Sequence, residues 1–146
     1  MVRIFQDTQG EIIKLVDRSI EQIICLDGVD CENIFTNIFL IWLKLKSEGS
    51  WHRIFLDAGG CLCEAYDDAV FAEKYAEDID NCEDCPIYQI NSRFSLQGLT
   101  IISASVSSFN IDRGGIQLKI FFDNGDSLIL QSEEVESGNN LLIIKS

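Results

Sequence analysis

Proline and histidine each occur once in this chain of 146 residues, and basic residues are scarce. Only 11 lysine and arginine side chains stand against 24 aspartates and glutamates, which gives a formal net charge of -13 at pH 7. Nucleic acids and anionic lipid surfaces are recognised through clustered Lys and Arg, so neither is an expected partner. A basic protein is the partner that this charge favours. The alternative is that the acidity only keeps the protein soluble.

Long apolar runs are also missing. The longest, Ile38 to Leu43, is far too short to span a bilayer, and the N-terminal MVRIFQDTQG lacks the apolar core of a secretion signal. We therefore expect a cytoplasmic protein with a single domain over residues 1–146. In that compartment its six cysteines are expected to be thiols or metal ligands rather than disulfides.

Common catalytic motifs are absent as well. The chain has no GxSxG, P-loop, GxGxxG or HExxH pattern. The single histidine, His52, has no nucleophile pattern nearby. Asp57 and Asp123 occupy matching turn positions, where an aspartate commonly accepts hydrogen bonds from the amides that follow it. We assign no catalytic residue, and a small enzyme using Asp57 or His52 ranks last among the alternatives.

Strand patterns dominate what is present. Ile116 to Phe122 alternates apolar and polar residues, Asp123-Asn124-Gly125-Asp126 follows, and Ser127 to Leu130 is the next apolar run. Asn-Gly supplies the positive-φ residues of a type I′ turn, so this segment is predicted to be a β-hairpin. Ile54 to Leu62 matches Ile120 to Leu128 at a constant offset, which predicts a second hairpin. Either an internal duplication, with halves 11–66 and 95–146, or convergent turn chemistry explains the match.

The other elements are less uniform. Residues 34–46 fit a helix or a strand, and their β-branched and aromatic content favours a strand paired with Trp51 to Asp57. Residues 11–26 are expected to hold one long bent strand or two short ones, and residues 67–79 a helix capped by Asp67 or Asp68. The expected fold is α+β and mostly β: two antiparallel β-meanders with one short acidic helix in the connecting segment. An uncovered edge of either meander can pair two chains, so a monomer or a homodimer is expected.

The connecting segment, residues 64–86, holds most of the negative charge. Residues 64–84 contain nine acids and one base, Lys74, so this span alone contributes a net charge of -8 (one minus nine). Such a concentration predicts an electrostatic docking surface for a basic protein, and the alternative is a solvated helix face. The candidate partner-binding residues are Asp67, Asp68, Glu73, Glu77, Asp78 and Asp80.

Four cysteines form a CxC…CxxC pattern: Cys61, Cys63, Cys82 and Cys85. Positions i and i+2 of a strand share one face, and a CxxC turn supplies two more thiolates, so one hypothesis is a tetrahedral zinc site. Free thiols are favoured instead, because buried cysteine is an ordinary core residue and the acids between Cys82 and Cys85 add negative charge to four thiolates. A redox or disulfide role is the third alternative. The expected cofactor is none, with zinc as the alternative.

One longer pattern carries a resemblance. Trp51-x-Arg53-x-Phe55-Leu56-Asp57-Ala58-Gly59, followed later by Leu118-x-Ile120-x-Phe122-Asp123-Asn124-Gly125-x-x-Leu128-x-Leu130, resembles small bacterial proteins similar to immunity proteins of polymorphic toxin systems. This resemblance covers about half of the chain and carries over no functional residue. It implies a non-catalytic protein that neutralises a toxin domain by binding it. The leading expectation is therefore a cytosolic protein-binding module that inhibits a basic partner.

Overall fold

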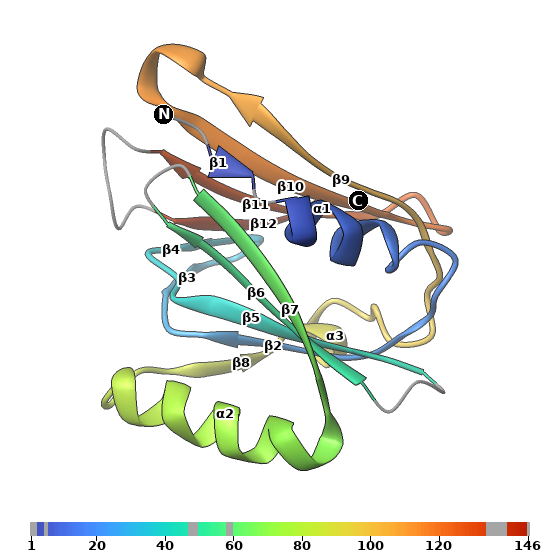
Figure 1. The fold of residues 1–146 in the computed structure, drawn as a ribbon, viewed down its shortest axis with the longest axis vertical. Helices are drawn as coiled ribbons and strands as arrows, with labels where there is room; N and C mark the ends of the chain where they lie inside the picture. Colours follow the sequence, from blue (N-terminus) through green and yellow to red (C-terminus); the bar gives the residue numbers. More distant parts are fainter. Residues whose placement is uncertain (1–2, 5, 47–49, 58–59, 134–139, 146) are drawn as a thin grey trace.

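The computed structural model describes residues 3–4, 6–46, 50–57, 60–133 and 140–145, whose strands form two six-stranded sheets packed face to face (Figure 1). The first sheet has the order β1 (Arg3–Ile4), β7 (Gly60–Asp67), β6 (Ser50–Asp57), β5 (Leu40–Leu45), β2 (Ile20–Leu26) and β8 (Ile87–Gln89). The second has the order β3 (Val29–Cys31), β4 (Ile34–Thr36), β12 (Leu141–Lys145), β11 (Ser127–Glu133), β10 (Gly115–Phe122) and β9 (Ile101–Phe109). These pairs are antiparallel except for β1 with β7, so the expected fold class, α+β and mostly β, is confirmed.

The helices lie outside the sheets. They are α1 (Gln6–Ile13), α2 (Asp68–Asn81) and α3 (Ile90–Arg93), with a short 3-10 turn, η1 (Ile111–Arg113). Only α2 was expected from the sequence. None of the helices in the described part of the chain is long and apolar enough to cross a membrane.

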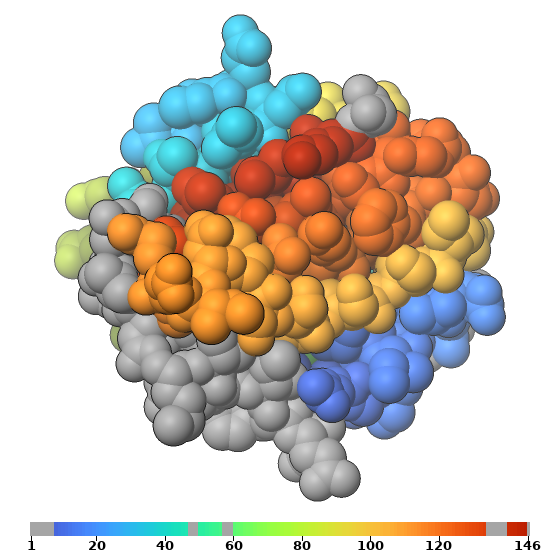
Figure 2. All heavy atoms as spheres, turned by 90° about the horizontal axis from the view of Figure 1, so that it is seen from above, coloured from blue at the N-terminus to red at the C-terminus, as the bar shows by residue number. Residues whose placement is uncertain are grey.

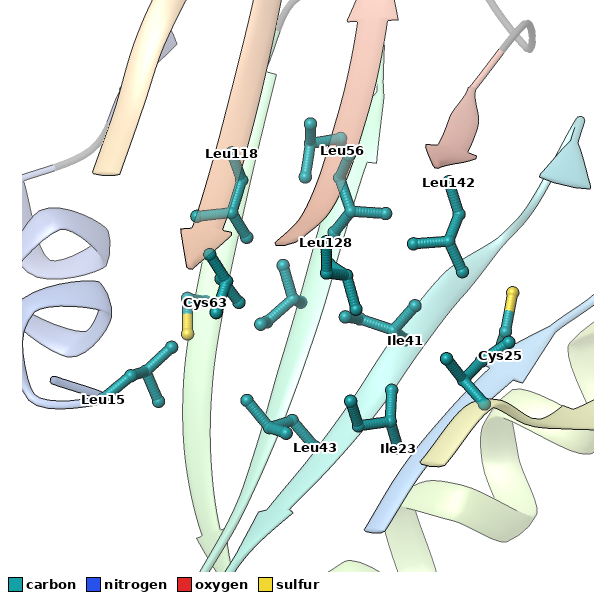
Figure 3. Close-up of a cluster of buried hydrophobic side chains, with 14 of the residues drawn as sticks. Leu15, Ile23, Cys25, Ile41, Leu43, Leu56, Cys63, Leu118, Leu128 and Leu142 are labelled. Carbon is teal, nitrogen blue, oxygen red and sulfur yellow. The ribbon is translucent and has the colours of Figure 1, made fainter. Parts of the chain in front are cut away.

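The main hydrophobic core lies between the two sheets, and each sheet contributes one apolar face to it (Figure 3). In β5 the alternation of a strand directs Ile41 and Leu43 into this core, while Trp42 points to the opposite side of the first sheet. Both faces of β5 are therefore buried. That explains why its sequence is apolar at nearly every position and why periodicity alone did not separate strand from helix.

Both predicted hairpins form, one in each sheet. β10 pairs with β11, and β6 pairs with β7; residues 58–59, which connect β6 to β7, lie outside the described residues. The turn after β10 is not the expected type I′: Gly125 has a positive φ of 92°, but Asn124 is not among the positive-φ residues. The Gly125 N–H donates to the carbonyl of Phe122 over 3.1 Å, so Gly125 closes a tight turn at its last position.

Residues 34–46 form two strands rather than one. The strand prediction is confirmed for β5, which pairs with β6, but Asn37 (φ 58°) breaks the segment and β4 joins the second sheet beside β12. The first half of the chain thus contributes β3 and β4 to the sheet formed by the second half. Residues 11–26 are also not all strand, because α1 continues to Ile13 before β2 begins at Ile20.

The outer faces of the two sheets differ. α2 covers the outer face of the first sheet, with a second apolar cluster between them (Figure 1). Figure 2 looks onto the second sheet, whose strands lie side by side from the blue-to-cyan β3–β4 segment to the gold and orange β9. The charged connecting segment and the long edge strand β9 therefore lie on different sides of the molecule.

Candidate protein-binding surface

The helix predicted over residues 67–79 is confirmed, and the sequence explains where it begins. Asp67 is the N-cap: its extended backbone (φ -74°, ψ 171°) turns the chain out of β7, and its carboxylate accepts a hydrogen bond from the Val70 N–H at 2.9 Å. The residue type and geometry are those of a standard N-cap. Asp67 therefore has a structural role as the N-cap of α2, and this role explains an aspartate at position 67 without any contact to a partner.

The inward side of α2 is aromatic. Phe71 stacks on Trp51 with ring centroids 3.9 Å apart and an angle of 7° between the rings, and it meets Trp42 edge-on at 5.0 Å. Tyr75 stacks on Phe71 in turn, at 5.2 Å. Aromatic pairs of this kind contribute about 0.5–1.5 kcal/mol each beyond the area that they bury. The helix is therefore held firmly on the first sheet, and its outward side has a fixed position.

Asp78, which was predicted as a partner-binding residue, does not lie on the surface of the chain. Only 4% of it is exposed, and its carboxylate accepts hydrogen bonds from Trp42 Nε1 at 2.9 Å and from Arg53 Nε and Nη2 at 2.9 and 2.8 Å. The Arg53 guanidinium is also 3.8 Å from Glu64. Its hydrogen bond with Asp78 raises the pKa of Arg53, in spite of its partial burial. Asp78 serves to fix α2 to β5 and β6.

Asp78 could have been placed inside from the sequence. It lies seven residues after Phe71 and three after Tyr75, which is the spacing of one helix face. What the spacing does not give is the partner: Arg53 comes from β6, and only the packing of α2 across the sheet brings the two charges together.

The outward side of α2 is formed by small and acidic residues, and we call it the acidic face. Its exposed members recur at helical spacing and are Ala69, Ala72, Glu73, Ala76, Glu77 and Asp80. Lys74 lies 3.8 Å from Glu77 at the border of this face. The alanine side chains between the carboxylates are short, so the charged groups protrude beyond them and are accessible to a cation on another protein.

Asp68 occupies the first turn of α2 and is exposed, but it has neighbours within the chain. Its carboxylate accepts a hydrogen bond from Trp51 Nε1 at 3.1 Å and lies 3.5 Å from Lys44 Nζ. Hydrogen bonding to Glu21 raises the pKa of Lys44, and Asp68 adds to that effect. Of the six predicted partner-binding residues, Glu73, Glu77 and Asp80 are thus exposed on one face, while Asp67 and Asp68 hold the start of the helix.

A polar hollow of about 270 Å³ opens between α2 and the strands β6 and β7. It is lined by Arg53, Glu64, Tyr66, Lys74, Glu77, Asp78 and Asn81. Glu77 belongs both to this hollow and to the acidic face, so the two form a continuous surface. Desolvation, followed by the nearby Glu64, raises the pKa of Tyr66, so this phenol stays protonated at neutral pH.

The four cysteines of the zinc hypothesis do not meet. Cys61 and Cys63 point from β7 into the core between the sheets, where Figure 3 shows Cys63 among leucines. Cys82 and Cys85 form a disulfide just beyond α2, on the other side of the first sheet, so the expectation of free thiols is wrong for them. No group of three or more His, Cys, Asp or Glu side chains in the described residues is arranged to hold a metal ion.

The buried thiols are chemically quiet. Burial raises the pKa of Cys61 to about 12, and it raises the pKa of Cys63 as well, helped by the neighbouring Cys61. Only the thiolate binds metals or attacks electrophiles, so these two side chains act as small apolar core residues.

The structure describes the side chains of two of the three residues considered for an enzyme, His52 and Asp123. His52 is 4% exposed and lies on the inner side of β6, with Ile54 and Leu56. Asp123 accepts a hydrogen bond from the Thr100 N–H at 3.2 Å, so it ties the β10–β11 turn to the start of β9. The side chain of Asp57 lies outside the described residues.

Comparison with known proteins adds no further constraint. No protein-family model, curated protein or solved structure matches the chain. The functional assignment therefore depends on the chain's own surface.

Proposed function

We propose that this chain is a non-catalytic cytosolic protein-binding module that binds a basic protein through the acidic face of α2, as an immunity-like inhibitor does. One observation carries the proposal. Glu73, Glu77 and Asp80 are exposed together on a helix whose other side is fixed by stacked aromatic rings and by the buried Asp78–Arg53 pair.

The geometry suits recognition of Lys and Arg side chains. A rigid helix presents its carboxylates without first losing conformational freedom on binding, which lowers the entropic cost of association. The chain's overall charge of -13 attracts a basic protein over a longer range, and such attraction increases the association rate more than the affinity.

The test is a titration with a partner first captured by the wild-type chain and identified by mass spectrometry. The acidic-face variant is Glu73→Gln, Glu77→Gln and Asp80→Asn. The control variant, Asp17→Asn, Glu32→Gln and Asp112→Asn, changes the same number of exposed charges elsewhere.

We expect the acidic-face variant to weaken binding by about tenfold, because exposed charge pairs contribute about 0.2–1 kcal/mol each. The control variant should bind within about twofold of wild type, since only its long-range attraction changes. Equal loss of affinity in both variants would show that net charge, and not the acidic face, recognises the partner. Unchanged affinity in both would exclude the proposal.

A further inference from the structure

β9 is the long edge strand among the described residues. The other edge strands, β1, β8 and β3, have two or three residues each, whereas β9 has nine. Short edges offer little backbone to another chain, but a long edge presents a row of N–H and C=O groups that can pair with a further strand.

Among the described residues, backbone hydrogen bonds from outside the second sheet reach β9 only at its start. The Asp17 N–H donates to the Ile101 carbonyl, and the Ile101 N–H donates to the Arg18 carbonyl, both at 2.8 Å. The strand pairing is then irregular at Ile102, which lies between the residues paired with Phe122 and Phe121. From Ser103 to Phe109, the backbone partners of the strand in the described structure all lie in β10. Alternate backbone groups over this stretch therefore face away from the sheet.

The sequence of β9 does not carry the features that keep edge strands apart. IISASVSSF contains no proline and no charged residue, in a chain in which 24% of residues are charged. Ser103, Ser105 and Ser107 are exposed and small, so a neighbouring strand meets no bulk. Beside the edge, a groove of about 300 Å³ lies between α1 and β9, and one of the residues lining it, Ile13, is 67% exposed.

We propose that β9 pairs antiparallel with β9 of a second copy, so that the second sheets of the two chains join into one continuous sheet. The stretch from Ser103 to Phe109, whose backbone partners among the described residues lie in β10, is centred on Val106. A two-fold axis there places Ser105 of each copy opposite Ser107 of the other. Figure 2 shows this edge, where the gold and orange strand lies beside the blue α1. The symmetry is that of most homodimers, in which each surface binds itself.

The charges around the edge fit a second copy in spite of the chain's net charge. Asp17 and Arg18 lie at one end of this stretch, and Asp112 and Arg113 at the other. Antiparallel pairing brings opposite ends together, so each meeting point combines charges of both signs: Asp17 and Arg18 of one copy meet Asp112 and the Arg113–Glu133 ion pair of the other. Lys119 of β10, which pairs with Ser105 of β9, would lie about 16 Å from its copy, three strand spacings across and two residues along the sheet, which is beyond the screening length of about 8 Å. The acidic face of α2 lies on the first sheet and stays outside this interface.

The test is molar mass in solution, measured by sedimentation equilibrium over a concentration series. Wild type should approach twice the chain mass of 16.5 kDa as concentration rises. The variant Ser105→Lys with Ser107→Lys should remain at the chain mass, because it places like charges opposite one another at the axis. Ser92→Lys adds a charge at an exposed position on α3 and should dimerise as wild type does.

A charge swap makes the test specific to β9. Ser105→Glu with Ser107→Glu should also be monomeric alone, and mixing it with the lysine variant should restore the dimer mass. Circular dichroism confirms that each variant is folded. In wild type, hydrogen exchange of the backbone amides from Ser103 to Phe109 should become slower as the protein concentration increases. A wild-type protein that stays monomeric at every concentration, or a dimer that the lysines leave intact, overturns the proposal.

Discussion

Replacing Asp78 by Asn tests the link between the acidic segment and the fold. The carboxylate accepts three hydrogen bonds from Trp42 and Arg53, all between 2.8 and 2.9 Å. An amide keeps one acceptor oxygen and turns its NH₂ group toward these donors. Removing one partner of a buried ion pair costs about 3–5 kcal/mol, because the remaining charge is left without compensation. Arg53 is 20% exposed and has Glu64 nearby, so we expect the lower end, about 3 kcal/mol.

That loss is measurable by urea unfolding followed by tryptophan fluorescence, since the indole of Trp42 is at the site. For a chain of this size it corresponds to a fall in Tm of about 6–12 °C. Asp80→Asn, on the exposed side of the same helix, should change the free energy of unfolding by no more than about 0.5 kcal/mol. A double-mutant cycle of Asp78→Asn with Arg53→Gln should give a coupling energy above about 1 kcal/mol. If Asp78→Asn is as stable as Asp80→Asn, the buried pair does not fix α2 and the reasoning fails.

Three further outcomes follow from burial and close packing. In the native, non-reduced protein at pH 8, an alkylating reagent should label Cys31 rapidly and Cys61 only after unfolding. Peptide mapping identifies the labelled cysteine, and rapid labelling of Cys61 would contradict its burial. Burial raises the pKa of Cys61 from 9.0 to about 12, so the contribution of its neutral thiol to stability is intact below pH 9 and is lost as the pH rises toward 12. Over this pH range the free energy of unfolding should fall more steeply in wild type than in Cys61→Ala. Equal slopes in the two proteins would contradict the raised pKa. Gly115→Ala places a Cβ 2.1 Å from the Phe109 carbonyl oxygen and should lower the free energy of unfolding in urea by about 2–3 kcal/mol. Gly125→Ala meets only the strain of a positive φ and should cost less. The reverse order would refute the close contact at Gly115.

The sequence predicted those elements whose signals are local. The alternation and the Asp-Asn-Gly-Asp loop of residues 116–130 sufficed for one hairpin, and the cap residue with helical spacing sufficed for α2. The exact turn type was not predictable, because the backbone of the loop is held by hydrogen bonds from the Phe122 N–H to the Asp126 carbonyl and from the Asp123 N–H to the Thr100 carbonyl.

Long-range pairing limited the rest. Nothing in residues 29–36 says that β3 and β4 extend the second sheet, because β12, the strand that pairs with β4, lies more than 100 residues further along, and β3 joins the sheet only through β4. The site was predictable in part for a similar reason. The exposed acids of α2 follow from helical spacing, while the burial of Asp78 depends on Arg53 of a neighbouring strand, and the Cys82–Cys85 pairing depends on how the chain turns after α2.

The salt dependence of the association rate tests the proposed function most directly. Partner binding is followed by stopped flow between low and high ionic strength, for wild type and for the variant with Glu73→Gln, Glu77→Gln and Asp80→Asn. If the acidic face guides a basic partner, the wild-type rate falls steeply with salt, and the variant is slower at low salt with a shallower dependence. Identical rates and identical salt dependence in the two proteins would contradict the proposal.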